Sequence, residues 1–402
     1  MVALMFHSVG LDKLKWASRH ISEPIKIFEQ KIKALKKTGF EAISFQEACS
    51  RIKTKSKTVC LTFDDGYLDN WVHVFPILKK YNMRATIFVT PEFVDPRHVI
   101  RPLSNPDHIN EEQHDPEQCC AGFLSWNEMK EMEKSGLIDI QSHGLTHAIY
   151  FKGAEIDDFW YPGAATEPNP LTPVWMLWNI MPEAKPFYLT KAAEYETKIP
   201  YGTPIYEYGP ALATKRYFPT NDLNEVIQEH IQSNGNDNYF QRNNWRDILK
   251  DLVRKYRNKQ NRNSSHGYFE TDNEYLQRVK FELSESKKII EHNLQKKVDG
   301  LCWPGGGVTE KVLEAAMDAG YRYFTLPSAW KNKRSQIMYP YMLPRMTSMS
   351  AHLRWRGRDL GVPTVHEFVW QVKKNSGYGI YVWSCRIALL ARLGRSYLGW
   401  TH

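Results

Sequence analysis

Short apolar runs alternate with helical patterns along the first 150 residues, and this alternation limits the chain to a few folds. Strands are predicted at residues 2–6 (VALMF), 57–63 (KTVCLTF) and 84–89 (RATIFV), and helical periodicity follows each of them. The alternation resumes after residue 273 with a long helical pattern and further short strands. Strand–helix alternation of this kind predicts a mainly parallel α/β sheet with helices outside it, either open or closed into a barrel.

The middle of the chain breaks this pattern. Residues 151–220 contain 10 of the 22 prolines and many aromatic residues, which predicts an irregular insertion. Residues 221–262 are basic and helical in pattern. The expected units are a barrel formed by residues 1–150 and 266–350, an insertion at 151–265, and an extension at 351–402 with a basic amphipathic helix.

The composition is that of an ordinary globular protein, with 42% hydrophobic and 24% charged residues. The N-terminus lacks the pattern of a secretory signal, so we expect residence in the cytoplasm. The net charge of +8 and the C-terminal amphipathic pattern suit an anionic partner, such as the headgroups at the inner membrane surface or a lipid-linked sugar phosphate. No nucleic-acid-binding motif accompanies the charge, so we expect no nucleic-acid partner.

Two neighbouring carboxylates, Asp64 and Asp65, follow the strand predicted at residues 57–63. Like charges repel when they are buried side by side, so the pair predicts either a solvated turn or a nearby cation. His143 and His147 follow a later strand and are four positions apart. Two histidines and one carboxylate are a common ligand set for a catalytic metal. Because sites in parallel folds lie at the carboxyl ends of strands, these groups predict a metal site.

A glycine-rich turn, CWPGGG at residues 302–307, ends another predicted strand. The backbone N–H of Gly305 is a candidate donor to a developing oxyanion. The alternative is that the three glycines only form the turn before the next helix.

The motifs LTFDDGY (61–67), SHGLTH (142–147) and CWPGGG (302–307), in this order, resemble the polysaccharide deacetylases, also called the NodB-homology domain or carbohydrate esterase family 4. The resemblance covers about residues 1–150 and 270–350. It implies a distorted (β/α)7 barrel related to the TIM barrel. It also implies metal-dependent removal of an acetyl group from an amino sugar, in a glycan or a lipid-linked saccharide.

The resemblance also implies residue roles. Asp64 would be the general base that activates a metal-bound water, and Asp65, His143 and His147 would bind the metal. The metal and the Gly305 N–H would stabilise the oxyanion. Zn²⁺ is the expected ion, with Co²⁺, Ni²⁺ and Mn²⁺ as alternatives.

The later motifs depart from the family pattern. The family has an arginine before the proline of the third motif, where this chain has Cys302 and Trp303. We expect Trp303 and Pro304 to contact the substrate. For Arg345 two roles stay open, orienting the substrate or forming a scaffold salt bridge.

The histidine that acts as general acid in the family has no clear counterpart here. We assign His352 to that role from its distance along the chain, with His366 as another option. Because of these departures, a deformylase or another C–N amide hydrolase on the same scaffold is one alternative function. An inactive glycan-binding module is the other.

Overall fold

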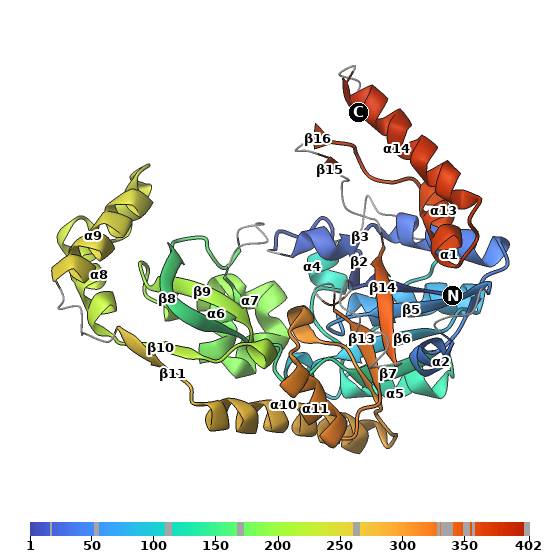
Figure 1. Cartoon of the computed structure of the whole chain (residues 1–402), viewed down its shortest axis with the longest axis horizontal. Coiled ribbons are helices and arrows are strands. Elements are labelled where there is room, and N and C mark those ends of the chain that lie inside the picture. Colours follow the sequence, from blue (N-terminus) through green and yellow to red (C-terminus); the bar gives the residue numbers. More distant parts are fainter. Residues whose placement is uncertain are drawn as a thin grey trace.

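The computed structural model describes residues 1–16, 18–51, 56–108, 115–166, 173–259, 266–327, 330, 341–348, 354–355 and 358–397. These residues form a parallel barrel, an elongated insertion on one side of it and a C-terminal helix pair that packs against it (Figure 1). The domain boundaries expected from the sequence stay a prediction. In the structure the chain leaves the barrel after residue 148 and returns to it after residue 270.

Seven parallel strands close the barrel. The pairing runs β1–β14–β13–β12–β7–β6–β5, and β1 also pairs with β5, which joins the two ends of the sheet. This confirms the predicted (β/α)7 barrel. The strands are β1 (Val2–Phe6), β5 (Thr58–Phe63), β6 (Ala85–Val89), β7 (Ile138–Ser142), β12 (Gly300–Leu301), β13 (Tyr323–Leu326) and β14 (Met342–Thr347), with β4 (Glu41–Ala42) added beside β5.

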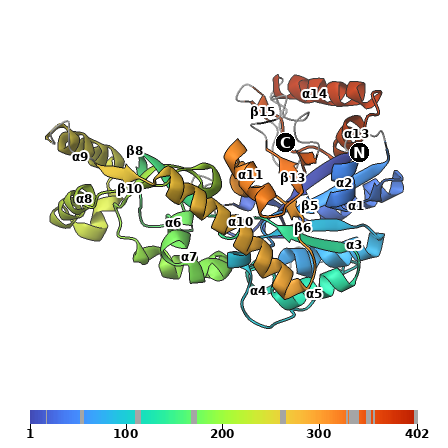
Figure 2. The same ribbon diagram turned by 60° about the horizontal axis from the view of Figure 1, so that its bottom comes forward.

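Helices cover the outside of the barrel (Figures 1 and 2). They are α1 (Ile25–Lys37), α2 (Phe45–Ser50), α3 (Phe75–Tyr81), α5 (Trp126–Lys134), α10 (Asp272–Leu294) and α11 (Glu310–Asp318). Ser125 and Glu128 form a capping box at the start of α5. The shorter elements include β2 (Ser8–Val9), β3 (Ser22–Glu23), α4 (Pro116–Cys119), β15 (Arg354–Trp355) and β16 (Arg358–Asp359).

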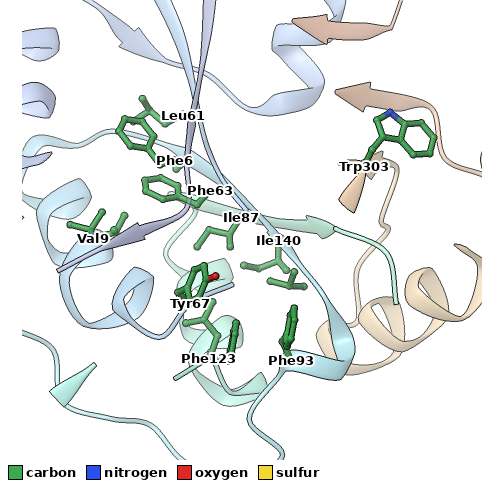
Figure 3. Close-up of a cluster of buried hydrophobic side chains, with 14 of the residues drawn as sticks. Phe6, Val9, Leu61, Phe63, Tyr67, Ile87, Phe93, Phe123, Ile140 and Trp303 are labelled. Carbon is green, nitrogen blue, oxygen red and sulfur yellow. The ribbon is translucent and has the colours of Figure 1, made fainter. Parts of the chain in front are cut away.

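Alternate residues of the barrel strands enter different hydrophobic clusters, as the period of two in a strand requires. Phe6 and Phe63 belong to the larger cluster, where their rings stack at 5.1 Å (Figure 3). Phe6 also meets Phe28 of α1 edge-on at 5.4 Å. Cys60 and Cys302 belong to a second, smaller cluster. Strand residues of the larger cluster therefore face the surrounding helices, and their neighbours along each strand face the opposite side of the sheet.

The insertion has more regular structure than the sequence predicts. A long antiparallel pair, β8 with β9, forms its frame, although proline and aromatic residues mask the alternation of these strands in the sequence. Residues of α8 and α9 build a separate small core against Phe159 of β8. The elements are β8 (Ile149–Phe159), α6 (Trp175–Ile180), α7 (Tyr188–Tyr195), β9 (Pro204–Pro210), β10 (Tyr217–Pro219), α8 (Asp222–Ser233), α9 (Trp245–Lys259) and β11 (Gly267–Phe269).

The C-terminal extension contains α13 (Val365–Asn375) and α14 (Tyr381–Tyr397). α13 packs against α1 of the barrel and against α14 (Figure 1). Within the described part of the chain, no helix combines the length and the apolar content that crossing a bilayer requires.

Candidate active site

Three predicted metal ligands converge at the carboxyl ends of β5 and β7. Asp65 Oδ1 lies 3.3 Å from His143 Nε2 and 3.5 Å from His147 Nε2. One ligand atom from each residue lies within 4.8 Å of the other two. The predicted juxtaposition of these three side chains is therefore present in the structure.

The same three residues fit a divalent metal ion. Asp65 Oδ1 is buried and has no hydrogen-bond partner among the described residues. Burying a carboxylate oxygen without a partner is costly, so this atom suits a cation. Two imidazole nitrogens and one carboxylate oxygen are a donor set that Zn²⁺ prefers.

The backbone at two of these residues is strained. Asp65 has a φ of 74° and His147 a φ of 49°, both in the left-handed region that residues with a Cβ rarely adopt. Such strain persists only where the surrounding structure fixes it, and it concentrates at functional sites. The local turns therefore aim both side chains inward.

Hydrogen bonds, charges and burial set the orientation and the pKa of the three predicted ligands. His143 Nδ1 lies 2.9 Å from the Cys302 carbonyl oxygen, which leaves Nε2 directed at Asp65. Burial alone would lower the pKa of His143, but its contacts with Cys302 and Asp65 raise it. Burial lowers the pKa of His147 to about 4. Burial alone would raise the pKa of Asp65, but the two histidines lower it.

Groups outside the barrel hold the loop that carries the two histidines. Glu282 of α10 accepts hydrogen bonds from the N–H groups of Leu145 and Thr146, at 3.0 and 2.7 Å. Lys185 of the insertion donates to the Thr146 carbonyl oxygen at 2.7 Å and also pairs with Glu92. The insertion therefore supports the site directly.

Asp64 is held in a different way from its neighbour. Arg345 of β14 forms a two-pronged pair with it, at 2.6 Å from Nη1 to Oδ1 and 2.7 Å from Nη2 to Oδ2. Burial alone would raise the pKa of Asp64, but the charge and hydrogen bonds of Arg345 lower it. Asp64 is therefore an oriented carboxylate, able to accept a proton.

This contact bears on the role of Arg345. Its guanidinium group also lies 3.0 Å from Cys302 Sγ, at the position where the family pattern has an arginine. Of the two roles left open by the sequence, the salt bridge is present in the structure. Arg345 also lines the cavity described below, so a role in orienting the substrate stays a prediction.

His7 is a site residue that the sequence reasoning missed. It follows β1, and its Nε2 lies 3.9 Å from Asp64 Oδ2. Asn70 Nδ2 donates to the His7 carbonyl oxygen at 3.0 Å, which fixes its backbone. The signal in the sequence was a histidine directly after the first predicted strand. The register that pairs Phe6 with Phe63, next to Asp64, is seen only in the structure.

The glycine-rich turn follows β12 and lies beside the loop that carries His143. Gly305 has a φ of 56°, and a Cβ there would lie 3.1 Å from Pro210 of the insertion, so glycine suits both constraints. The N–H groups of Gly306 and Gly307 make the hydrogen bonds of the turn. Pro304 packs against Gly144 of the histidine loop.

A cavity of about 810 Å³ opens over these residues. Trp303 lines it, while its Nε1 donates to the Thr325 carbonyl oxygen at 2.9 Å and its ring stacks on Phe324. The remaining lining includes His7, Asp64, Asp65, His143, His147, Gly305 and Arg345, together with the aromatic residues Tyr67, Phe93, Trp178 and Tyr188. The lining therefore combines aromatic rings with the polar groups of the predicted metal site.

Two histidines, His352 and His366, are the candidates for the general acid that the sequence offers. His352 lies outside the described residues. His366 is exposed in the first turn of α13, away from the residues that line the cavity.

The polysaccharide deacetylase family model matches residues 51–163 and 225–324, more than half of the chain. The chain therefore belongs to the polysaccharide deacetylase family.

Individual relatives match over shorter stretches. The putative polysaccharide deacetylase YxkH of Bacillus subtilis (strain 168) is 33% identical over 148 residues, which are 36% of this chain and 42% of that protein. The poly-beta-1,6-N-acetyl-D-glucosamine N-deacetylase of Escherichia coli (strain K12) is 25% identical over 146 residues, 35% of this chain and 20% of that protein. The matches thus span less than half the length of these relatives. Among solved structures, the BpsB deacetylase domain from Bordetella bronchiseptica is similar, with 17% identity, a TM-score of 0.46, and coverage of 86% of this chain and 95% of that one.

Proposed function

We propose that this protein is a metal-dependent N-deacetylase that acts on N-acetylated amino sugars, in a glycan polymer or a lipid-linked saccharide. The observation that carries the proposal is the meeting of Asp65, His143 and His147 directly beside the oriented carboxylate of Asp64. Family membership and the activity named for the Escherichia coli relative support the same reaction class.

A divalent ion bound by Asp65, His143 and His147, for which we expect Zn²⁺, would polarise the amide carbonyl and lower the pKa of water. Asp64 takes a proton from the attacking water, because it is ionised and Arg345 fixes both of its oxygens. Asp64 is the neighbour of Asp65 in the sequence, so the proposed base would lie next to a proposed metal ligand.

His7 is the group best placed to protonate the leaving amine. It lies on the cavity side of Asp64, and its side chain is 22% exposed, so it can exchange protons with solvent. The N–H of Gly305, a residue of the cavity lining, would donate to the oxyanion. Base, acid and oxyanion donor thus come from three different strand ends.

The test measures metal content and product release on the purified protein. We expect roughly one divalent ion per chain, and release of acetate from oligomers of N-acetylglucosamine. Asp64→Asn should keep the metal and lose acetate release by at least roughly a thousandfold. Asp65→Ala should lose both, and Asp318→Asn on the exposed face of α11 serves as the matched control.

Three results would contradict the proposal. Unchanged metal content in Asp65→Ala would exclude the proposed ligand set. Release of formate from N-formylated sugars without release of acetate would favour a deformylase. Binding of the oligomers with no release, unaffected by Asp64→Asn, would favour a glycan-binding module. Residence in the cytoplasm stays a prediction.

A further inference from the structure

Helix α14 exposes a row of large apolar side chains. Ile380, just before the helix, and Trp383, Ile387 and Leu390 within it are each 64–76% exposed. Their spacing of three, four and three residues places them on one side of the helix. We call these four residues the α14 stripe. A contiguous apolar stripe on an exposed helix indicates a surface that binds another apolar phase.

The opposite side of α14 is fixed to the protein. Arg392 is buried, pairs with Glu367 of α13, and donates to the carbonyl oxygens of Leu360 and Val362 at 2.6 and 3.0 Å. At about 100° per residue, Arg392 lies roughly 160° around the helix from the centre of the stripe. The anchor therefore directs the α14 stripe away from α13.

The C-terminal part of the chain, which includes the stripe, is basic. Residues 351–402 contain eight lysines and arginines against two acidic residues, which gives +6 of the net +8 of the whole chain. The segment Tyr381–Tyr397 has three arginines and no acidic residue. The guanidinium carbon of Arg386 lies 5.3 Å from the centre of the Trp383 ring, so one charge borders the stripe itself.

The occupant must therefore offer an apolar layer bordered by negative charge. Tryptophan and arginine side by side on one face of a helix suit the boundary between the headgroups and the acyl chains of a bilayer. Anionic headgroups would attract the C-terminal charge. We propose that α14 binds flat on the surface of an anionic lipid bilayer through the α14 stripe. This binding is independent of the proposed reaction.

The experiment uses the full chain and vesicles of phosphatidylcholine with or without phosphatidylglycerol, separated by flotation. We expect binding to the anionic vesicles that falls as salt is added. The double variant Trp383→Glu/Ile387→Glu should lower binding at least roughly tenfold. Arg386→Glu should lower it roughly fivefold. Acetate release from a soluble oligomer should stay at the wild-type level in both variants.

Two controls separate the stripe from exposure or charge alone. Phe281→Glu changes an exposed aromatic residue on α10 and should leave vesicle binding unchanged. Lys250→Glu/Lys259→Glu changes the basic but less apolar α9 and should have little effect. Circular dichroism checks that every variant is folded.

Several results would overturn the proposal. Wild-type protein that stays unbound on anionic vesicles would do so, as would a stripe variant that binds as well as wild type. Loss of binding on changing α9 alone would move the surface to the insertion. A wild-type dimer that Trp383→Glu/Ile387→Glu converts to a monomer, without vesicle binding by either, would assign the stripe to a second copy of the chain.

Discussion

The barrel and the segments attached to it position their functional groups in different ways. In the barrel, Asp64, His143 and His7 each stand directly after a parallel strand, so strand register brings them together. The insertion and α13 instead pack on the barrel through apolar residues of the main hydrophobic cluster. Charged anchors add to this packing: Lys185 ties the insertion to the histidine loop, and Arg392 ties α14 to α13. Substitutions in the barrel site should therefore abolish catalysis. Substitutions in the anchors should cause smaller losses, in metal affinity or in the attachment of α14.

Outside the metal ligands and the base, the largest effect is expected at His7. Replacing it by asparagine removes the proposed general acid, and kcat should fall roughly 10²- to 10⁴-fold while metal content stays unchanged. Steady-state kinetics and metal analysis measure the two quantities. His366→Asn is the matched control and should behave as wild type. The reverse result, with His366 essential and His7 dispensable, would place the acid elsewhere.

Arg345 should affect both stability and rate. Arg345→Met leaves the buried carboxylate of Asp64 without its partner, so we expect a loss of about 3–5 kcal/mol in the free energy of unfolding and a lower kcat. Arg345→Lys keeps the charge but not the two-pronged geometry, so its free energy of unfolding and its kcat should lie between those of wild type and Arg345→Met. Urea unfolding measures the stability change. An unchanged free energy of unfolding in Arg345→Met would refute the positioning role.

A smaller effect is expected for the anchor of the insertion. Lys185→Met removes a hydrogen bond to the loop that carries His147, so metal affinity should fall roughly 10- to 100-fold. At saturating metal, kcat should stay near wild type. Titration against a competing chelator measures the affinity, with Lys191→Met on the exposed side of α7 as control. Wild-type affinity in Lys185→Met would show that the insertion does not support the metal loop.

The smallest effect is expected for the pH dependence of the Glu367–Arg392 pair, which anchors α14. Burial alone would raise the pKa of Glu367, but hydrogen bonds from Arg392 and Thr364 lower it to about 2, below its ordinary value of 4.5. The pair therefore stabilises the docked helix fully above pH 4.5, and this contribution is lost as the pH falls towards 2.

Hydrogen exchange in α14, corrected for intrinsic rates, should rise over that range in the wild type. Glu367→Gln should already show raised exchange at neutral pH, with a flatter pH dependence. Equal protection in both proteins at neutral pH would contradict the anchoring role.

The sequence predicts the local part of the site better than the part that depends on barrel closure. Asp65, His143 and His147 could be grouped because each follows a strand and because two of them are close in sequence. His7 and Arg345 reach Asp64 only because β1 lies between β5 and β14, a pairing that no local pattern encodes. The assignment of His352 relied on distance along the chain, which carries no information about register.

Arg345 follows Asp64 by 281 residues, and this separation has a consequence for synthesis on the ribosome. At ordinary translation rates roughly 15–60 s pass between the two residues. Once His147 has been added, the nascent chain holds the carboxylates and both imidazoles, but not yet the guanidinium group that orients the base. A polypeptide that ends before β14 would therefore lack an oriented base and be inactive. Activity would begin only after β14 has been synthesised and has paired with β1.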